Sequence, residues 1–179
     1  DGNVYETVAI GNQVWMAENL KVTHYRNGDE LLTGLSHNEW AQSDLETGAY
    51  AVYDDNESNA STYGYLYNWY AVDDSRNIAP EGWHVASDEE WYTLTDYLGG
   101  DAGSQLAGNA DLWNDGDLVN NSEFGTSGFT AVPGGYRLDV DWVWGYYDMG
   151  NFCVFWTSTA TTYNAWYRIL RYYETGVYR

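Results

Sequence analysis

The sequence is poor in cysteine, because Cys153 is the only one among 179 residues. A single thiol cannot form a disulfide within the chain or supply a multi-cysteine metal site. Its neighbours Phe152, Val154 and Phe155 are apolar. We therefore expect Cys153 to be a small buried hydrophobic residue and not a catalytic thiol.

Basic residues are also scarce. Seven Lys+Arg stand against 27 Asp+Glu, which gives a formal net charge of −20, and Lys21 is the only lysine. A field of that sign repels phosphate backbones and anionic lipid, so we expect no nucleic-acid partner. No apolar run approaches the ~18–20 residues of a membrane span, so no membrane insertion is expected.

Linker-like composition is missing as well. Only Pro80 and Pro133 occur, and no Ser/Pro tract or internal repeat interrupts the chain. A length of 179 residues is within the usual range for one domain. We expect a single domain over residues 1–179.

Motifs for covalent catalysis are absent too. Gly-x-Ser-x-Gly does not occur, and His24, His37 and His84 are scattered along the chain. The many acidic residues always offer some carboxylate pair at the ~5–10 Å separation of glycosidases, but no feature selects one. We predict no catalytic residues, so the chain is not expected to be an enzyme, and a hydrolase is the weakest alternative.

Tryptophan and tyrosine are abundant. Ten Trp and 18 Tyr stand against four Phe. Cores accept Phe freely, whereas Trp and Tyr are favoured where one end of the ring is packed and the other is wet, as at binding surfaces. We expect part of these rings to build the core and part to form a surface that contacts a partner.

Local patterns predict both strands and helices. Val4–Ile10 and Gln13–Met16 flank Gly11-Asn12, which is typical of a β-hairpin with a two-residue turn. Ser87–Gly99 begins with a capping box formed by Ser87 and Glu90, and it ends at a glycine pair. Tyr65–Val72 has short helical spacing. The prediction is an α+β domain of short antiparallel strands, about two helices and long loops.

Short strand-like runs separated by turn signals follow residue 128. In one of them, Trp142, Trp144 and Tyr146 share one phase and would form a ring ladder on one face. Arg168 and Arg171 would either anchor carboxylates or stack on rings. Binding hot spots use the same mixture of Tyr, Trp and Arg. The residues predicted to bind a ligand or partner are Trp142, Trp144, Tyr146, Tyr147, Tyr163, Arg171, Tyr173 and Tyr178.

Several stretches, taken together and in order, resemble the Fibrobacter succinogenes major paralogous domain, a family of bacterial secreted and surface proteins. Any one stretch is a weak signal, but the ordered set covers nearly the whole chain. The stretches are Asp1–Tyr5, Ile10–Leu20, Tyr63-Gly64, Leu66–Val72, Pro80–Val85, Ser87-Asp88, Glu90-Trp91, Gly128–Ala131, Pro133–Arg137, Phe155–Thr159 and Ala165–Arg168.

The resemblance implies a C-type-lectin-like α+β fold, related to the fold of the formylglycine-generating enzymes, and an extracellular or cell-surface location. In similar proteins the region after the Trp-Thr-Ser stretch often forms a variable ligand-binding face. Here that face would include Thr159–Tyr163, Ile169 and Glu174 beside the arginine and tyrosines already named. The resemblance concerns a fold that hosts many functions, so the ligand does not follow from it.

Two departures from the family pattern are expected to matter. Similar domains carry a cysteine just before the Pro-x-Gly-Trp-His stretch, where this sequence has Ala79, and they continue past the equivalent of Arg179 with a further strand. We expect the domain to lack that final strand and to expose an open sheet edge. An unpaired edge is a template for another chain.

Two functions therefore stay open. The first is a non-catalytic binding or adhesion module that presents its C-terminal aromatic surface to a protein or glycan ligand. The second is a structural subunit of a homopolymeric filament or sheath, in which copies of the chain meet through the open sheet edge.

Loop carboxylates provide a candidate calcium site, and no other cofactor is expected. Asp111, Asp115 and Asp117 are spaced so that their oxygens could surround a Ca²⁺ ion. A second acidic loop, at residues 54–57, offers the same chemistry. In both loops, carboxylates that simply face solvent are the competing interpretation.

Overall fold

The capping box at Ser87 is present in the computed structural model, which describes residues 1–41, 46–140, 143–161 and 165–179. The Glu90 backbone N–H donates to Ser87 Oγ at 3.2 Å, and the Ser87 N–H donates to the Glu90 carboxylate at 2.8 Å. Helix α4 (Asp88–Leu98) therefore begins where predicted, and it ends at Gly99. Its Trp91 and Leu94 are buried.

The predicted hairpin is also confirmed. Strands β1 (Thr7–Ile10) and β2 (Gln13–Met16) pair antiparallel, with Ile10 opposite Gln13. Gly11 has φ 58°, the left-handed conformation that the first residue of this turn requires and that glycine adopts without strain. The first strand begins three residues later than predicted.

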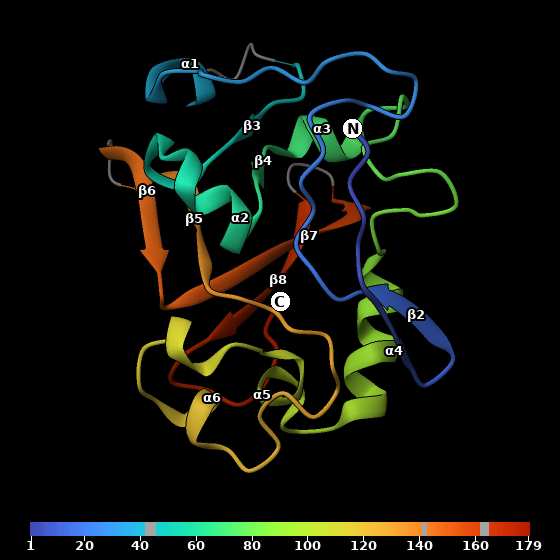
Figure 1. Ribbon diagram of the computed structural model, residues 1–179, viewed down its shortest axis with the longest axis vertical. Coiled ribbons are helices and arrows are strands. Elements are labelled where there is room, and N and C mark those ends of the chain that lie inside the picture. Colours follow the sequence, from blue (N-terminus) through green and yellow to red (C-terminus); the bar gives the residue numbers. More distant parts are fainter. Residues whose placement is uncertain (42–45, 141–142, 162–164) are drawn as a thin grey trace.

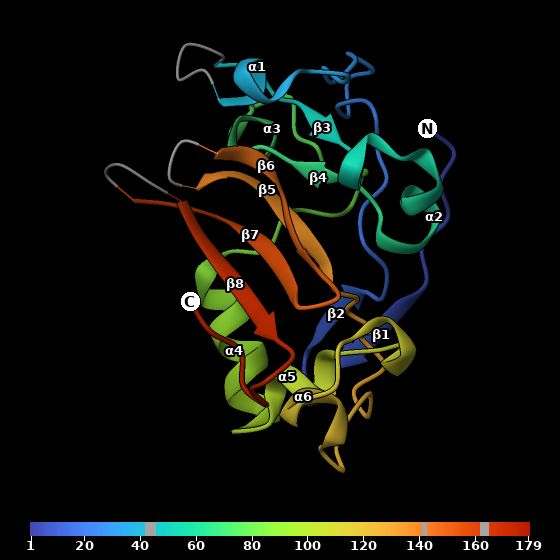
Figure 2. The same ribbon diagram turned by 90° about the vertical axis from the view of Figure 1, so that its left-hand side faces the viewer.

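Four strands after residue 133 form the largest sheet, seen in Figure 2. They are β5 (Gly134–Val140), β6 (Val143–Met149), β7 (Phe152–Ala160) and β8 (Ala165–Arg171), in the order β6-β5-β7-β8. β5 pairs antiparallel with β6, and β7 with β8, but β5 and β7 are parallel and meet at Gly135 and Cys153. The expectation of antiparallel strands only was therefore wrong. β6 folds back along one side of β5, so β7 lies on the other side and runs in the same direction as β5.

The other helices and strands of the described chain are short, and long loops connect them. These elements are α1 (His37–Ala41), β3 (Tyr50–Ala51), α2 (Ala60–Tyr63), β4 (Leu66–Tyr67), α3 (Trp69–Asp73), α5 (Ala102–Leu106), α6 (Asp117–Asn120) and three 3-10 turns, Tyr53–Asp55, Glu57–Asn59 and Ala110–Leu112. The helix predicted over Tyr65–Val72 is shorter than expected, because Leu66 and Tyr67 pair with β3 and Asn68 caps α3. About two helices were expected; the additional ones have four or five residues, too few to show a helical period.

Two clusters of buried side chains form the core. The first joins α4 to β7 and β8 and includes Trp91, Leu106 and Leu170. The second joins the loop after β2 to α3 and includes Tyr25, Leu31 and Ile78. In Figure 1, α3 lies in the upper half of the molecule and α4–α6 in the lower half. No helix within the described ranges is both long and apolar enough to cross a membrane.

The chain after β8 turns back along the outer edge of that strand. Ile169 and Tyr178 exchange two backbone hydrogen bonds, of 2.9 and 3.0 Å, as an isolated antiparallel bridge. A side chain at Gly103 would overlap the carbonyl of Gly176, so only glycine lets α5 approach this segment so closely. The edge that was expected to be open is therefore paired at Ile169.

An ion pair at the second cluster makes stability depend on pH. Arg76 lies 2.6 Å from Asp74 and stacks 4.0 Å from the Tyr25 ring centroid. Hydrogen bonds from the Arg76 side chain lower the pKa of Asp74 to about 2, from an ordinary value of 3.8. Because the folded pKa is depressed, this stabilisation is complete above pH 4 and is lost as the pH falls toward 2.

We expect Asp74→Asn to lower the free energy of unfolding by about 1 kcal/mol near neutral pH, allowing for partial solvent screening. The difference from the wild type should vanish as the pH approaches 2. Urea titrations across the acid range measure it. The exposed neighbour substitution Asp73→Asn should shift stability by less than about 0.5 kcal/mol at every pH, and equal acid profiles for the two variants would contradict the assignment.

Candidate functional site

Four aromatic side chains form a row across one face of the four-stranded sheet. The ring centroids of Tyr147 and Tyr136 lie 5.9 Å apart, those of Tyr136 and Phe152 lie 6.4 Å apart, and those of Phe152 and Tyr173 lie 6.2 Å apart. Tyr136 and Phe152 are nearly parallel, with an interplanar angle of 10°. Strand alternation places Tyr147, Tyr136 and Phe152 on the face opposite to Cys153 and its buried neighbours, and Tyr173 follows β8.

Three further residues extend the row along β8 and the segment after it. Tyr167 is 42% exposed and Tyr178 is 38% exposed. The Arg171 guanidinium carbon lies 4.8 Å from the Tyr178 ring centroid, and Nη1 lies 3.2 Å from the Glu174 carboxylate. Arg171 thus both stacks on a ring and anchors a carboxylate. We call the whole set the aromatic face: Tyr136, Tyr147, Phe152, Tyr167, Arg171, Tyr173 and Tyr178.

Polar groups of the aromatic face are held by the protein. The Tyr136 hydroxyl donates to Asp148 Oδ2 at 2.8 Å. Burial and this hydrogen bond to a carboxylate raise the pKa of Tyr136 to about 12, so the phenol stays protonated at neutral pH. Burial also raises the pKa of Tyr178. The aromatic face therefore combines aromatic rings, among them the protonated Tyr136 phenol, with one cation, Arg171.

The structure brings together four of the predicted binding residues: Tyr147, Arg171, Tyr173 and Tyr178. Tyr146 lies on the opposite face of β6, because successive strand residues alternate. Its ring packs 5.3 Å from the Tyr53 ring, and its hydroxyl donates to Asp55 Oδ1 at 2.6 Å. Burial raises the pKa of Tyr146, and the Asp55 hydrogen bond adds to that shift.

The remaining predicted positions lie outside the described part of the chain. These are Trp142, Tyr163 and the side chain of Trp144. Sequence reasoning missed Tyr136 and Phe152, which complete the row, and Tyr167 on β8. Tyr136 pairs with Tyr147 and Phe152 with Arg171, and this register, which the sequence does not show, is what places them beside predicted residues.

The predicted calcium ligands Asp111, Asp115 and Asp117 are exposed at the surface near α6. Asp115 accepts a hydrogen bond from Asn120 Nδ2 at 2.8 Å. Across the ranges that the structure covers, no three His, Cys, Asp or Glu side chains gather closely enough to hold a metal ion. The calcium site stays a prediction, and Ca²⁺ calorimetry tests it.

The structure shows that several other residues are buried or bonded within the protein, among them ones that the sequence analysis named. Cys153 is 3% exposed, as expected, and burial raises the pKa of its thiol. Arg168 is 6% exposed, and its Nη2 lies 2.5 Å from Asp88 Oδ1. The His84 ring lies 2.8 Å from the Glu90 carboxylate of the capping box. Trp113, which lies between the predicted calcium ligands Asp111 and Asp115, is buried and donates from Nε1 to the Gly108 carbonyl at 3.1 Å.

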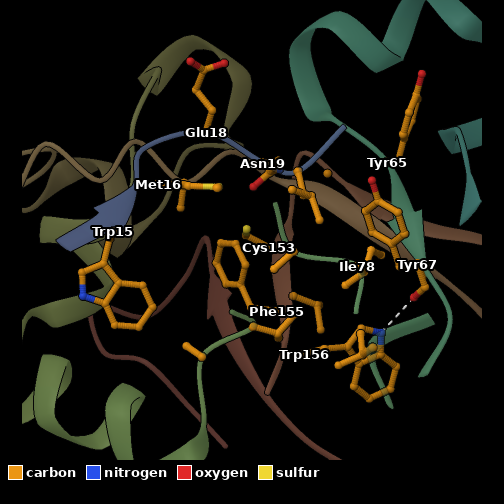
Figure 3. A pocket seen from close by; sticks show the side chains of 18 of the residues that line it. Trp15, Met16, Glu18, Asn19, Tyr65, Tyr67, Ile78, Cys153, Phe155 and Trp156 are labelled. Atoms are coloured by element: carbon orange, nitrogen blue, oxygen red, sulfur yellow. Dashed lines mark hydrogen bonds between the residues drawn. The ribbon is translucent and has the colours of Figure 1, made fainter. Parts of the chain in front are cut away.

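A cavity of about 650 Å³ lies between the two core clusters, and both Arg137 and Tyr136 of β5 line it. Figure 3 shows that β2, β4 and β7 contribute side chains that surround one space. Trp15 and Met16 lie at one side of the cavity and Tyr67 and Ile78 at the other. Phe155 from β7 lies between them. No sequence pattern indicated this cavity, because its walls come from segments that lie far apart in the sequence.

Comparisons with known proteins identify the family alone. Neither the curated proteins nor the solved structures contain a match to this chain. Residues 8–179, nearly the entire sequence, match the Fibrobacter succinogenes major domain. The chain belongs to the Fibrobacter succinogenes major domain family.

Proposed function

We propose that the chain is a non-catalytic binding or adhesion module that holds a protein or glycan ligand against its aromatic face. The row of four rings spaced about 6 Å apart, three of them half-buried and Tyr173 exposed, is the observation that carries this proposal. A C-type-lectin-like fold and an extracellular or cell-surface location belong to the same proposal, and they rest on the family resemblance.

Ring chemistry and charge define the ligand class. Tyrosine rings offer a large rigid contact surface at little entropic cost, with a hydroxyl that donates or accepts at the rim. Tyr167 and Tyr173 are each more than 40% exposed, so a ligand would bury substantial apolar area on them. A chain with a net charge of −20 repels anionic partners at long range, which favours neutral glycans or proteins with a basic surface.

Two matched double variants test the proposal. Tyr167→Ala with Tyr173→Ala removes exposed rings from the aromatic face, whereas Tyr92→Ala with Tyr97→Ala removes two rings that are 65% and 67% exposed on α4. On a printed array of neutral glycans and immobilised basic proteins, the first variant should lose at least about tenfold in affinity for any ligand of the wild type. The second should keep the wild-type pattern.

Equal losses in the two double variants would contradict a localised binding face. A wild-type chain that binds nothing on either array would contradict the ligand classes proposed. Near-ultraviolet circular dichroism confirms that each variant has kept its packing before the arrays are compared.

Homotypic assembly is the second candidate, because β6 and β8 are the two outer strands of the sheet. Tyr178 covers β8 at Ile169, but no strand of the described chain lies beyond Ala165 or Tyr167 on that side. Copies could pair along this part of the edge. Light scattering and electron microscopy of the purified chain decide: regular polymers favour assembly, and monomers at high concentration contradict it.

A further inference from the structure

We propose that the cavity between the two core clusters binds a small amphiphilic monocarboxylate, with its apolar body against the aromatic walls and its carboxylate at Arg137. This site adjoins the aromatic face at Tyr136, which also lines it, but Arg137 points to the other side of β5 from Tyr136, and no other member of the aromatic face is among the lining residues. Two observations support the proposal: the walls of the cavity are largely aromatic and apolar, and Arg137 is buried without a carboxylate partner among the described residues.

The walls favour an apolar ligand body. A volume of about 650 Å³ is within the range of about 300–1,000 Å³ that small-molecule sites occupy. Trp156 Nε1 donates to the Tyr67 carbonyl at 2.8 Å, and the Tyr67 hydroxyl donates to the Val22 carbonyl at 2.9 Å. The polar ends of both rings are therefore satisfied, as the dashed line in Figure 3 shows for Trp156. Water beside such walls would be displaced favourably by an apolar group.

The carboxylates that line the cavity have partners of their own. Glu18 accepts from the Glu6 backbone N–H at 3.1 Å and lies 3.4 Å from Lys21 Nζ. Glu90 serves the capping box of α4 and contacts His84. The carboxylates of Glu18 and Glu90 are already hydrogen-bonded within the protein, so they do not determine the charge of the ligand.

Arg137 lines the cavity and is nine-tenths buried, with 9% exposure. Its Nη2 donates to the Leu35 carbonyl at 2.7 Å and lies 3.3 Å from His37 Nδ1. Its guanidinium carbon lies 4.6 Å from the Trp40 ring centroid and 5.0 Å from that of Tyr146. These contacts fix the plane of the guanidinium group between two rings without neutralising its charge.

The buried Arg137 guanidinium group would be stabilised by a bound anion. Among the residues that the structure describes, no ion pair involves Arg137, and its buried Nε has no hydrogen-bond partner. An unpaired buried charge is costly, and a guanidinium group matches a carboxylate in two parallel hydrogen bonds. The other orphaned polar atom at the cavity, Trp15 Nε1, is also a donor. Arg137 Nε and Trp15 Nε1 are both hydrogen-bond donors, so a ligand that satisfies them must carry an acceptor.

The negative charge of the whole chain does not oppose this assignment at short range. Exposed charges act mainly on the encounter rate, and physiological salt screens them over about 8 Å. Arg137 acts at contact and in a partly dry site, where a charge-assisted hydrogen bond is strongest. A carboxylate should therefore be preferred over an alcohol with the same body.

Calorimetric titration with decanoate and with decanol tests this preference below their aggregation concentrations. We expect decanoate to bind about tenfold or more tightly than decanol, because only the carboxylate makes charge-assisted hydrogen bonds. Arg137→Gln should lower the affinity for decanoate to the level of decanol. Met16→Trp, which fills part of the cavity, should weaken both ligands by about tenfold or more.

Arg171→Gln is the matched control, because it removes an arginine from the aromatic face and should change neither affinity. Equal binding of decanoate and decanol to the wild type would overturn the proposal, and so would unchanged decanoate affinity in Met16→Trp. If Arg137→Gln does not fold, as judged by near-ultraviolet circular dichroism, the Met16→Trp titration still decides. Absence of decanoate binding at millimolar concentration would also overturn it.

Discussion

Replacing Trp91 with alanine is expected to lower the free energy of unfolding by about 3–5 kcal/mol. Trp91 is 3% exposed on the inner side of α4. Its ring centroid lies 5.1 Å from that of Trp15, 5.2 Å from Phe155 and 6.0 Å from Phe129. Three aromatic neighbours cannot all move to fill the space, so the loss includes a residual cavity as well as the transfer of the indole to water.

Urea unfolding followed by far-ultraviolet circular dichroism measures this effect. Tyr92→Ala is the control, because Tyr92 is the next residue on the same helix but is 65% exposed. Its stability should change by less than about 0.5 kcal/mol. Losses of similar size in the two variants would show that α4 is stabilised by its own residues and not by packing on the sheet.

The second large effect is expected from Asp88→Asn, which should cost about 2–4 kcal/mol. Asp88 Oδ1 lies 2.5 Å from Arg168 Nη2, and Asp88 Oδ2 lies 2.9 Å from Arg179 Nη2. The Arg168 side chain is 7% exposed, so removal of its partner leaves a buried cation uncompensated. A remaining bond from Arg168 to the Asp88 carbonyl, at 3.2 Å, moderates the loss.

Glu89→Gln provides the control for this variant, because it removes one negative charge from the same exposed helix terminus without touching an arginine. It should cost a few tenths of a kcal/mol through the helix dipole. If both variants lose equally, the dipole and not the Arg168 pair accounts for the role of Asp88. Arg179 also stacks 3.5 Å from the Trp166 ring centroid, so Asp88→Asn should loosen the residues after β8 as well.

Elements that depend on neighbours in sequence were predictable. Ser87 and Glu90 are three residues apart, and their reciprocal hydrogen bonds require no other part of the chain. The hairpin turn at Gly11 is equally local. The family resemblance was carried by short stretches of this kind, and the match over residues 8–179 confirms it.

Features that depend on distant segments were not predictable. The spacing of Leu66 and Trp69 is helical, but pairing with β3 holds Leu66 extended. Pairing of Gly135 with Cys153 makes the sheet mixed, and nothing near either residue indicates it. The same limit applies to the candidate site, because the sequence does not show which face of β6 each ring occupies. Tyr147 and Tyr146 are adjacent, and only the contacts of Tyr146 with Tyr53 show which of the two faces inward.

Arg137 illustrates the limit most clearly. In the sequence it is one of seven basic residues and belongs to a family-like stretch. Its environment is assembled from α1, β5 and β6, so its burial and its missing carboxylate appear only in three dimensions. A one-dimensional pattern records residue type but not desolvation, and desolvation is what gives this arginine its chemical interest.

The burial of the only cysteine makes the kinetics of thiol labelling a probe of one place in the chain. Cys153 is 3% exposed in β7 and also lines the cavity. Burial raises the pKa of its thiol, so the closed form should react slowly with a maleimide or a disulfide reagent. Where closing outpaces reaction, the labelling rate yields the free energy of opening around β7. Reagents of increasing size would then separate openings that admit a small molecule from those that release the strand.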